Sequence, residues 1–352
     1  MRWYSGENLP RTHAKPTFSE SWLHRNCGFS FDEKYFSDPI FRTEQDRAAR
    51  RVLYERFKGV GIGSENPEPQ PHLDICGHRF TPALFGCEIM FQEGEAPAAR
   101  GLSLDSPDDI ATIPKPDLNS NHWAQEFSRQ GGLLLERYGH VDATINFGGP
   151  LNAATTIVGT EFFSYLADSA SGAERFLDTV ADLCLECFDK LTLPLNPELG
   201  LEREMFIGNC PVAMVSPKMY FDQILPSDMR LRRKVRKFGL HHCGKMDGYL
   251  KAYTALLPLE FIEVGWGSTI AAVRQTFPTT ILDLMIHVYD VCEMSASTMR
   301  AVITDIVRQG APKRRIRDIW MADIGPDVSD QVVVNFVEAV NAAFNDTKES
   351  SG

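Results

Sequence analysis

Short apolar runs that end in polar or thiol-bearing side chains recur along the second half of this chain. Four of them read EMFIGNC (204–210), FGLHHCG (238–244), LEFIEVG (259–265) and IWMADIG (319–325). Their length and flanking glycines are typical of buried strands, and longer segments with helical spacing of apolar residues separate them. The alternation predicts an α/β fold with a parallel sheet, and it leaves open whether that sheet is flat or closed into a barrel.

An amphipathic helix is predicted near the start of the chain. Residues 41–63 place Ala48, Val52, Leu53 and Phe57 on one apolar face. We expect this helix to end at Gly59 and Gly61, with its many arginines on a solvated face. The three prolines in residues 64–74 then predict an extended connector.

Two further patterns resemble functional motifs but have a structural interpretation. Cys184 and Cys187 form a Cys-x-x-Cys pair within residues 176–191, where helical periodicity predicts that both pack in the core. The basic run at 230–237 is predicted to be the solvated face of a helix, and contact with an acidic partner is the alternative.

The overall composition narrows the class of function. The chain has 352 residues, of which 43% are hydrophobic and 24% charged, as is ordinary for a soluble globular enzyme. A net charge of -11 argues against a nucleic-acid or membrane-surface binder, because such proteins present basic surfaces. The sequence has no run of 18 apolar residues and no apolar signal segment at its start, so we expect a cytoplasmic enzyme that acts on a small molecule. Its eight scattered cysteines fit reduced thiols better than disulfides.

His241 and Cys243 stand out as candidate metal ligands at the end of a predicted strand. Because side chains alternate along a strand, His241 and Cys243 share one face and His242 points to the other. Gly244 then allows the backbone to turn tightly after Cys243. Imidazole nitrogen and thiolate sulfur are donors that suit zinc. The alternative is that His241 is a hydrogen-bonded core histidine and Cys243 a small buried hydrophobe. The next two apolar runs end in Glu263 and Asp323, and these acids favour the metal interpretation.

The order of motifs along the last 210 or so residues resembles the uroporphyrinogen decarboxylase superfamily. The matching segments are 149–163, 209–220, 238–244, 260–267 and 321–330. Within that superfamily, the His-x-Cys-Gly motif is similar to the zinc site of corrinoid-linked methyltransferases that act on methylcobamides. The spacing is also similar to the zinc site of cobalamin-independent methionine synthase.

The resemblance implies a (β/α)8 TIM barrel over residues 76–347, preceded by an N-terminal helical extension and connector at residues 1–75. It further implies a zinc ion held by four ligands: His241, Cys243, Glu263 and Asp323. Asp323 stands where the family has a late cysteine, which makes the ligand set less rich in thiolate. Whether Cys87 or Cys210 contributes a ligand is left open.

The resemblance implies methyl transfer as the activity. The methyl group would move between a small methylated substrate or thiol and a corrinoid (cobalamin), which a separate corrinoid protein would carry. His241 and Cys243 would be the catalytic residues. Asn146 and Asn209, each at the end of a predicted strand, are expected to bind substrate. A homodimer is left open as the assembly.

Two alternatives belong to other classes of function. The first is a metal-independent lyase of decarboxylase type, in which His241 and Asp323 orient a carboxylated substrate. The arginine-rich signature that grips carboxylates in uroporphyrinogen decarboxylases is missing here, which counts against this alternative. The second is a non-catalytic binding subunit, and the aspartate at the late cysteine position motivates it.

Overall fold

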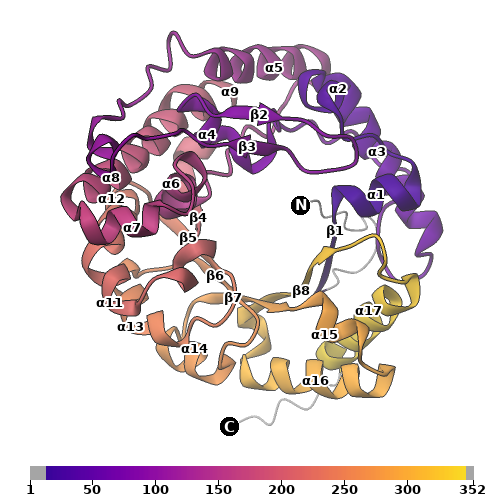
Figure 1. Cartoon of the computed structure of the whole chain (residues 1–352). Helices are drawn as coiled ribbons and strands as arrows, with labels where there is room; N and C mark the ends of the chain where they lie inside the picture. Colours follow the sequence, from indigo (N-terminus) through magenta and orange to yellow (C-terminus); the bar gives the residue numbers. More distant parts are fainter. Residues whose placement is uncertain (1–12, 346–352) are drawn as a thin grey trace.

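A curled parallel sheet forms the centre of the molecule, and helices surround it (Figure 1). The computed structural model describes residues 13–345. The sheet has six strands in the order β1-β8-β7-β6-β5-β4, and every neighbouring pair is parallel. The strands are β1 (Ala14–Phe18), β4 (Glu204–Gly208), β5 (Lys237–His242), β6 (Phe261–Val264), β7 (Ile281–Ile286) and β8 (Ile316–Ile324). The α/β class and the four apolar runs predicted as strands are thereby confirmed.

The hydrogen-bonded sheet covers only part of the predicted barrel. Between β1 and β4 in sequence, two extended stretches meet at an isolated parallel bridge between His72 and Asp142. The Leu73 amide donates to the Asp142 carbonyl and the Asp142 amide to the Pro71 carbonyl, both at 2.9 Å. The predicted strand that leads to Asn146, at residues 140–147, therefore forms only this single bridge. The structure establishes a six-stranded, half-barrel sheet, and closure with eight strands stays a prediction.

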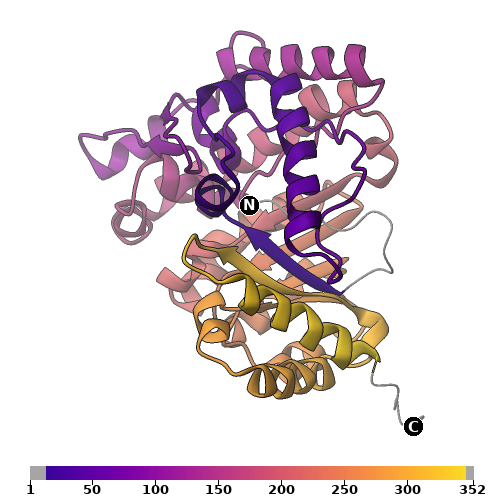
Figure 2. The ribbon, with the colours of Figure 1, turned by 90° about the vertical axis from the view of Figure 1, so that its right-hand side faces the viewer.

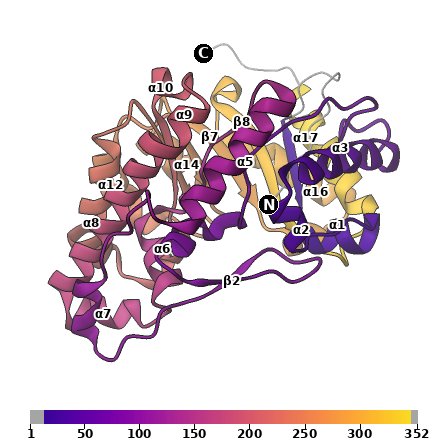
Figure 3. The ribbon, with the colours of Figure 1, turned by 90° about the horizontal axis from the view of Figure 1, so that it is seen from above.

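Helices of varied length connect the strands and cover the outside of the sheet (Figures 1 and 2). In the first half of the chain they are α1 (Glu20–Cys27), α2 (Glu33–Ser37), α3 (Pro39–Arg56), α4 (Phe80–Leu84), α5 (His122–Tyr138), α6 (Gly149–Ile157) and α7 (Phe162–Asp168). The middle holds α8 (Ala170–Cys187), α9 (Leu193–Leu195), α10 (Leu199–Glu202), α11 (Pro217–Met219), α12 (Leu225–Arg232) and α13 (Leu250–Tyr253). The last are α14 (Ile270–Thr276), α15 (Val288–Cys292), α16 (Ala296–Gln309) and α17 (Asp330–Asn345). A small antiparallel hairpin, β2 (Glu88–Met90) with β3 (Ala98–Arg100), lies on the same side of the molecule as α6 and α7 (Figure 3).

The N-terminal segment contributes a strand that the sequence pattern did not predict. β1 pairs with β8, the last strand, through contacts such as Ala14 opposite Ile319 (Figure 2). Buried Ala14 and Phe18 belong to the main hydrophobic core. Part of the predicted extension at residues 1–75 is therefore continuous with the central sheet.

The predicted amphipathic helix is confirmed as α3, and Leu53 and the following Phe57 are buried as predicted, but the rest of its buried face is different from the prediction. Ala48 and Val52 are exposed, whereas Arg42 and Arg50 are buried. The prediction of a solvated arginine face is wrong for these two residues. Arg42 can be buried because its guanidinium donates to backbone carbonyls, including those of His72 and Asp74. These hydrogen bonds replace the ones that it would make to water.

The two other helical predictions have different outcomes. Cys184 and Cys187 lie on α8 and are fully buried, which confirms core packing. The basic run at 230–237 is split, because α12 ends at Arg232 and β5 begins at Lys237. Arg230 is on the outside of α12 and pairs with Asp182 on α8.

Two chain segments pack closely against each other at the carboxyl ends of β5 and β6. Gly244 has φ of 74°, so the backbone turns immediately after Cys243, as the sequence predicted. A Cβ atom at Gly265 would lie 2.2 Å from the His242 carbonyl oxygen. Glycine at 265 therefore lets the segment after β6 pack directly against the segment that carries Cys243.

Within residues 13–345, no helix combines the length and the apolar character needed to cross a membrane.

Candidate metal centre

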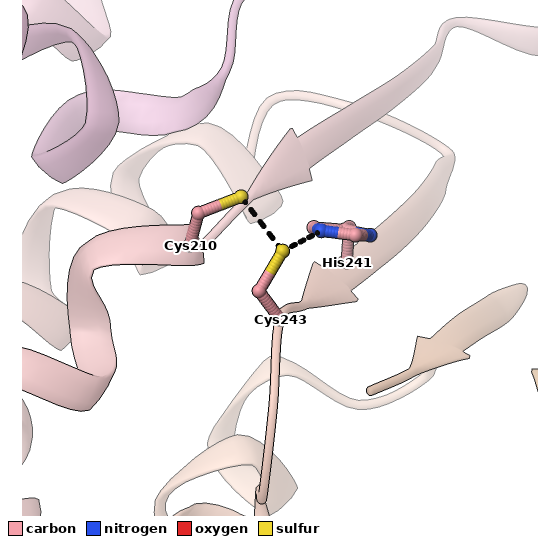
Figure 4. Close-up of side chains that lie close together, drawn as sticks. All are labelled: Cys210, His241 and Cys243. Atoms are coloured by element: carbon pink, nitrogen blue, oxygen red, sulfur yellow. Dashed lines mark hydrogen bonds between the residues drawn. The ribbon is translucent and has the colours of Figure 1, made fainter. Parts of the chain in front are cut away.

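Cys210, His241 and Cys243 meet at the carboxyl ends of β4 and β5 (Figure 4). Their ligand atoms all lie within 4.8 Å of one another. The Cys243 thiol donates a hydrogen bond to the Cys210 sulfur at 3.2 Å, and Nε2 of His241 lies 2.8 Å from the Cys243 sulfur. All three side chains therefore direct their donor atoms to one point.

The two strands explain why these residues converge. β4 and β5 are adjacent and parallel, with Gly208 opposite His241, so their carboxyl ends reach the same edge of the sheet. Cys210 follows two residues after Gly208, and its neighbour Asn209 donates its backbone N–H to the His241 carbonyl at 2.8 Å. The loop that carries Cys210 is thus tied to the strand that carries the other two ligands.

The carboxylate of Glu263 orients the His241 ring through its Nδ1 atom. Nδ1 of His241 lies 2.9 Å from Oε2 of Glu263 on β6, which is opposite His241 in the sheet. Lys15 on β1 donates to the other carboxylate oxygen at 3.4 Å and lies over the Trp320 ring. A carboxylate on the far nitrogen fixes the ring orientation of a ligating histidine and leaves its other nitrogen for the metal.

Hydrogen bonds among the three residues shift the pKa of each of them. The hydrogen bond from Cys243, helped by His241, lowers the pKa of the Cys210 thiol well below its ordinary value. The same hydrogen bond and burial raise the pKa of Cys243. Burial alone would lower the pKa of His241, but its hydrogen bonds to Cys210 and Glu263 raise it to about 9. These shifts favour the deprotonated form of Cys210 beside the protonated form of His241, so a metal ion that binds there must displace protons.

The three residues line a cavity of about 450 Å³ at the strand ends. Aromatic and apolar side chains form much of its wall, among them Phe147, Phe206, Trp266, Met285 and Trp320. Its polar lining includes Lys15, His78, Arg79, Asn146, Asn152, Glu263 and Asp323. The volume and the mixed lining are typical of a site for a small molecule.

The residues that the structure brings together differ from the four ligands predicted from the sequence. His241 and Cys243 come together as predicted, and Cys210 joins them. Glu263 contacts the centre through His241 rather than as part of the group of three. Asp323, exposed near the end of β8 with φ of 56°, lines the cavity but is outside that group.

The structure also shows where Cys87, Asn146 and Asn209 lie relative to the centre. Cys87 is buried and contacts the Ile157 carbonyl, away from the centre. Asn146 lines the cavity, where its amide nitrogen lies 2.9 Å from Nδ1 of His78. Asn209 is fully buried, and its amide donates to Asp228 at 3.1 Å instead of facing the cavity.

His242 points away from the centre, as strand alternation predicted. Its ring is fully buried, and Nδ1 shares a hydrogen bond of 2.8 Å with the Tyr253 hydroxyl. Burial lowers the pKa of His242 to about 4, so its ring is neutral. This residue is part of the support behind the metal centre and not of the ligand set.

The donor set fits zinc. Two sulfur atoms and one imidazole nitrogen at a single point are the ligands that zinc prefers, and three protein ligands leave a fourth position for substrate. A hard cation such as Mg²⁺ or Ca²⁺ would need oxygen ligands instead. The hydrogen bond from His241 to Glu263 completes the second layer of contacts common in such sites.

Comparisons with known proteins support the fold. No protein-family model matches the chain, and no curated protein matches it in sequence. Among solved structures, the chain is similar to a methyltransferase from Methanosarcina mazei, with a TM-score of 0.65 and 14% sequence identity. The match covers 96% of this chain and 96% of that protein. The chain therefore shares the overall fold of that methyltransferase over nearly its whole length.

Proposed function

We propose that this protein is a zinc-dependent methyltransferase that moves a methyl group between a small substrate and a corrinoid carried by a separate protein. The observation that carries the proposal is the convergence of Cys210, His241 and Cys243 on one point at the wall of a cavity. The fold shared with a methyltransferase supports the same class of reaction.

Each residue of the centre has a separate role in this proposal. Cys210, His241 and Cys243 would hold the zinc ion, and Glu263 keeps the His241 ring oriented. A zinc ion bound there would supply Lewis acidity that makes a substrate thiol nucleophilic at neutral pH. Lys15 balances the charge of Glu263, so the carboxylate remains an acceptor for His241.

The cavity defines how the substrates reach the centre. Its volume of about 450 Å³ accommodates a small thiol or methylated donor. A corrinoid is too large for this space, so it must present its methyl group from outside. The aromatic wall, which includes Trp266 and Trp320, limits the access of water to the reacting atoms. Asn146 and Asp323 line the same space and are proposed to contact the substrate.

The proposal is tested with free methylcobalamin as a substitute for the corrinoid protein. The zinc-loaded protein is mixed with methylcobalamin and a panel of small thiols, and loss of the methylcobalt bond is followed by the visible spectrum. The reverse reaction uses cob(I)alamin with methylated thiols, ethers and amines. We expect catalysis in one of these two directions.

The matched variants are Cys210→Ala, in the centre, and Cys292→Ala, at an exposed cysteine outside it. The first should lose activity and the second should keep it. If the wild type shows no methyl transfer in either direction but releases carbon dioxide from a carboxylated substrate, the methyltransferase proposal is wrong and the lyase alternative replaces it.

A further inference from the structure

A buried polar cluster lies directly behind the metal centre. It consists of Asn209, Tyr220 and Asp228, each fully buried. The Tyr220 hydroxyl donates to Oδ2 of Asp228 at 2.7 Å, and the Asn209 amide donates to the same oxygen at 3.1 Å. A single carboxylate oxygen thus holds both partners.

This cluster is connected to the metal centre through the backbone. Asn209 immediately precedes Cys210, and its N–H donates to the carbonyl of His241 at 2.8 Å. Asp228 therefore fixes the side chain of the residue that joins the loop of Cys210 to the strand of His241. Asp228 lies on α12 and is not one of the residues that line the cavity, so it contacts neither the substrate nor the three ligands directly.

Burial of this cluster lowers the stability of the folded protein. Oδ1 of both Asn209 and Asp228 is buried without a hydrogen-bond partner within the described residues. Burial raises the pKa of Asp228 to about 6, which means that the folded protein disfavours its charged form. An apolar pair of similar volume would avoid both costs. The presence of a carboxylate at this place is better explained by the geometry that it imposes on Asn209 and Cys210.

We propose that Asp228 is a positioning residue that acts through Asn209 to hold the Cys210 sulfur beside that of Cys243. The inference rests on the proposed metal centre, because its consequence is a higher affinity of that centre for metal. It assigns no role to Asp228 in the transfer of the methyl group itself.

The experiment measures metal binding rather than activity. Cobalt(II) is titrated into metal-free protein, and its thiolate charge-transfer absorption reports the number of bound sulfur ligands. Asp228→Ala should weaken cobalt binding by about 10- to 100-fold and reduce the thiolate absorption, as for other residues that support metal ligands. Asp228→Asn keeps an oxygen acceptor for Tyr220 and Asn209 and should restore most of the affinity.

A matched control separates positioning from general stability. Tyr35 and Asp46 form a second buried tyrosine–aspartate pair, with the hydroxyl 2.9 Å from the carboxylate, away from the centre. Asp46→Ala should lower the thermal stability of metal-free protein without changing cobalt affinity. Equal losses of affinity in Asp46→Ala and Asp228→Ala, or unchanged affinity in Asp228→Ala, would overturn the inference.

A second readout does not depend on metal binding. One equivalent of hydrogen peroxide oxidises the two thiols of Cys210 and Cys243 to a disulfide and is itself reduced to two water molecules. In metal-free protein this disulfide should form several-fold more slowly in Asn209→Ala and Asp228→Ala than in wild type, because the sulfur atoms are less well aligned. If wild type binds no cobalt, the proposed function fails. The rate of disulfide formation still tests the positioning role of Asp228, because equal rates in all three proteins would contradict that role.

Discussion

Cys210 and Cys243 are 33 positions apart in the sequence, and their sulfur atoms are 3.2 Å apart in the structure. Adjacent parallel strands create this proximity, because β4 and β5 deliver their following residues to one edge of the sheet. We predict that Cys210→Ala loses bound zinc as completely as Cys243→Ala does. Elemental analysis of the purified proteins measures this. Stoichiometric zinc in the Cys210 variant would mean that another residue supplies the third ligand.

For Asp323 we predict the opposite effect of substitution on bound zinc. It lines the cavity but lies outside the group of three ligands, so Asp323→Asn should retain a full complement of zinc. The same variant should change the Michaelis constant of the small substrate, because the carboxylate faces the space that the substrate occupies. Loss of zinc in Asp323→Asn would instead support the four-ligand set predicted from the sequence.

Glu263→Gln should weaken zinc binding without abolishing it. The amide can still accept a hydrogen bond from Nδ1 of His241, but it lacks the charge that supports a ligating imidazole. We expect the affinity to fall by about 10- to 100-fold, measured by competition with a chelator. Glu260→Gln, at an exposed residue just before β6, is the control and should leave the affinity unchanged. Equal effects of the two substitutions would count against the orienting role.

Asp228 should make the stability of the protein depend on pH. Its pKa is raised from 3.8 to about 6 by burial, so between these values the folded state binds more protons than the unfolded state. The free energy of unfolding therefore falls as pH rises from about 4 to 6, by about 3 kcal/mol for a shift of two units. Asp228→Asn removes this contribution, so wild type should lose stability relative to the variant over this range. Urea unfolding at several pH values tests this, and a difference independent of pH would be contrary to the prediction.

Arg42 is expected to be essential for stability. Its buried guanidinium donates to the carbonyls of Tyr35, Phe36, His72 and Asp74 and to the side chain of Gln130. Arg42→Met leaves several of these acceptors without a donor and should lower the free energy of unfolding by about 3 kcal/mol or more. Arg175→Met, at an exposed position on α8, should change it by less than about 0.5 kcal/mol. Chemical denaturation of both variants makes the comparison.

The strands and two of the three clustered side chains were predictable because they depend on local patterns. The apolar runs ending at His242, Val264 and Ile324 gave the strands β5, β6 and β8, and alternation along β5 placed His241 and Cys243 on one face. The turn at Gly244 followed from the same stretch. These features need only the period of a strand and the conformational freedom of glycine.

The rest depended on relationships between distant segments. Cys210 follows a predicted strand, but only the pairing of β4 with β5 shows that its sulfur reaches Cys243. Asp323 lies near the end of β8, and the structure leaves it outside the group of Cys210, His241 and Cys243. Strand β1 and the buried Arg42 were missed because short strands and buried charged groups owe their place to tertiary partners, which no local pattern encodes.

X-ray absorption spectroscopy at the zinc edge of the purified protein, with and without a small thiol, identifies the atoms bound to the metal. We predict one zinc per chain with two sulfur ligands and one imidazole nitrogen from the protein, and a third sulfur ligand once the thiol is added. Absence of bound zinc, or a first shell of oxygen and nitrogen without sulfur, would contradict this prediction.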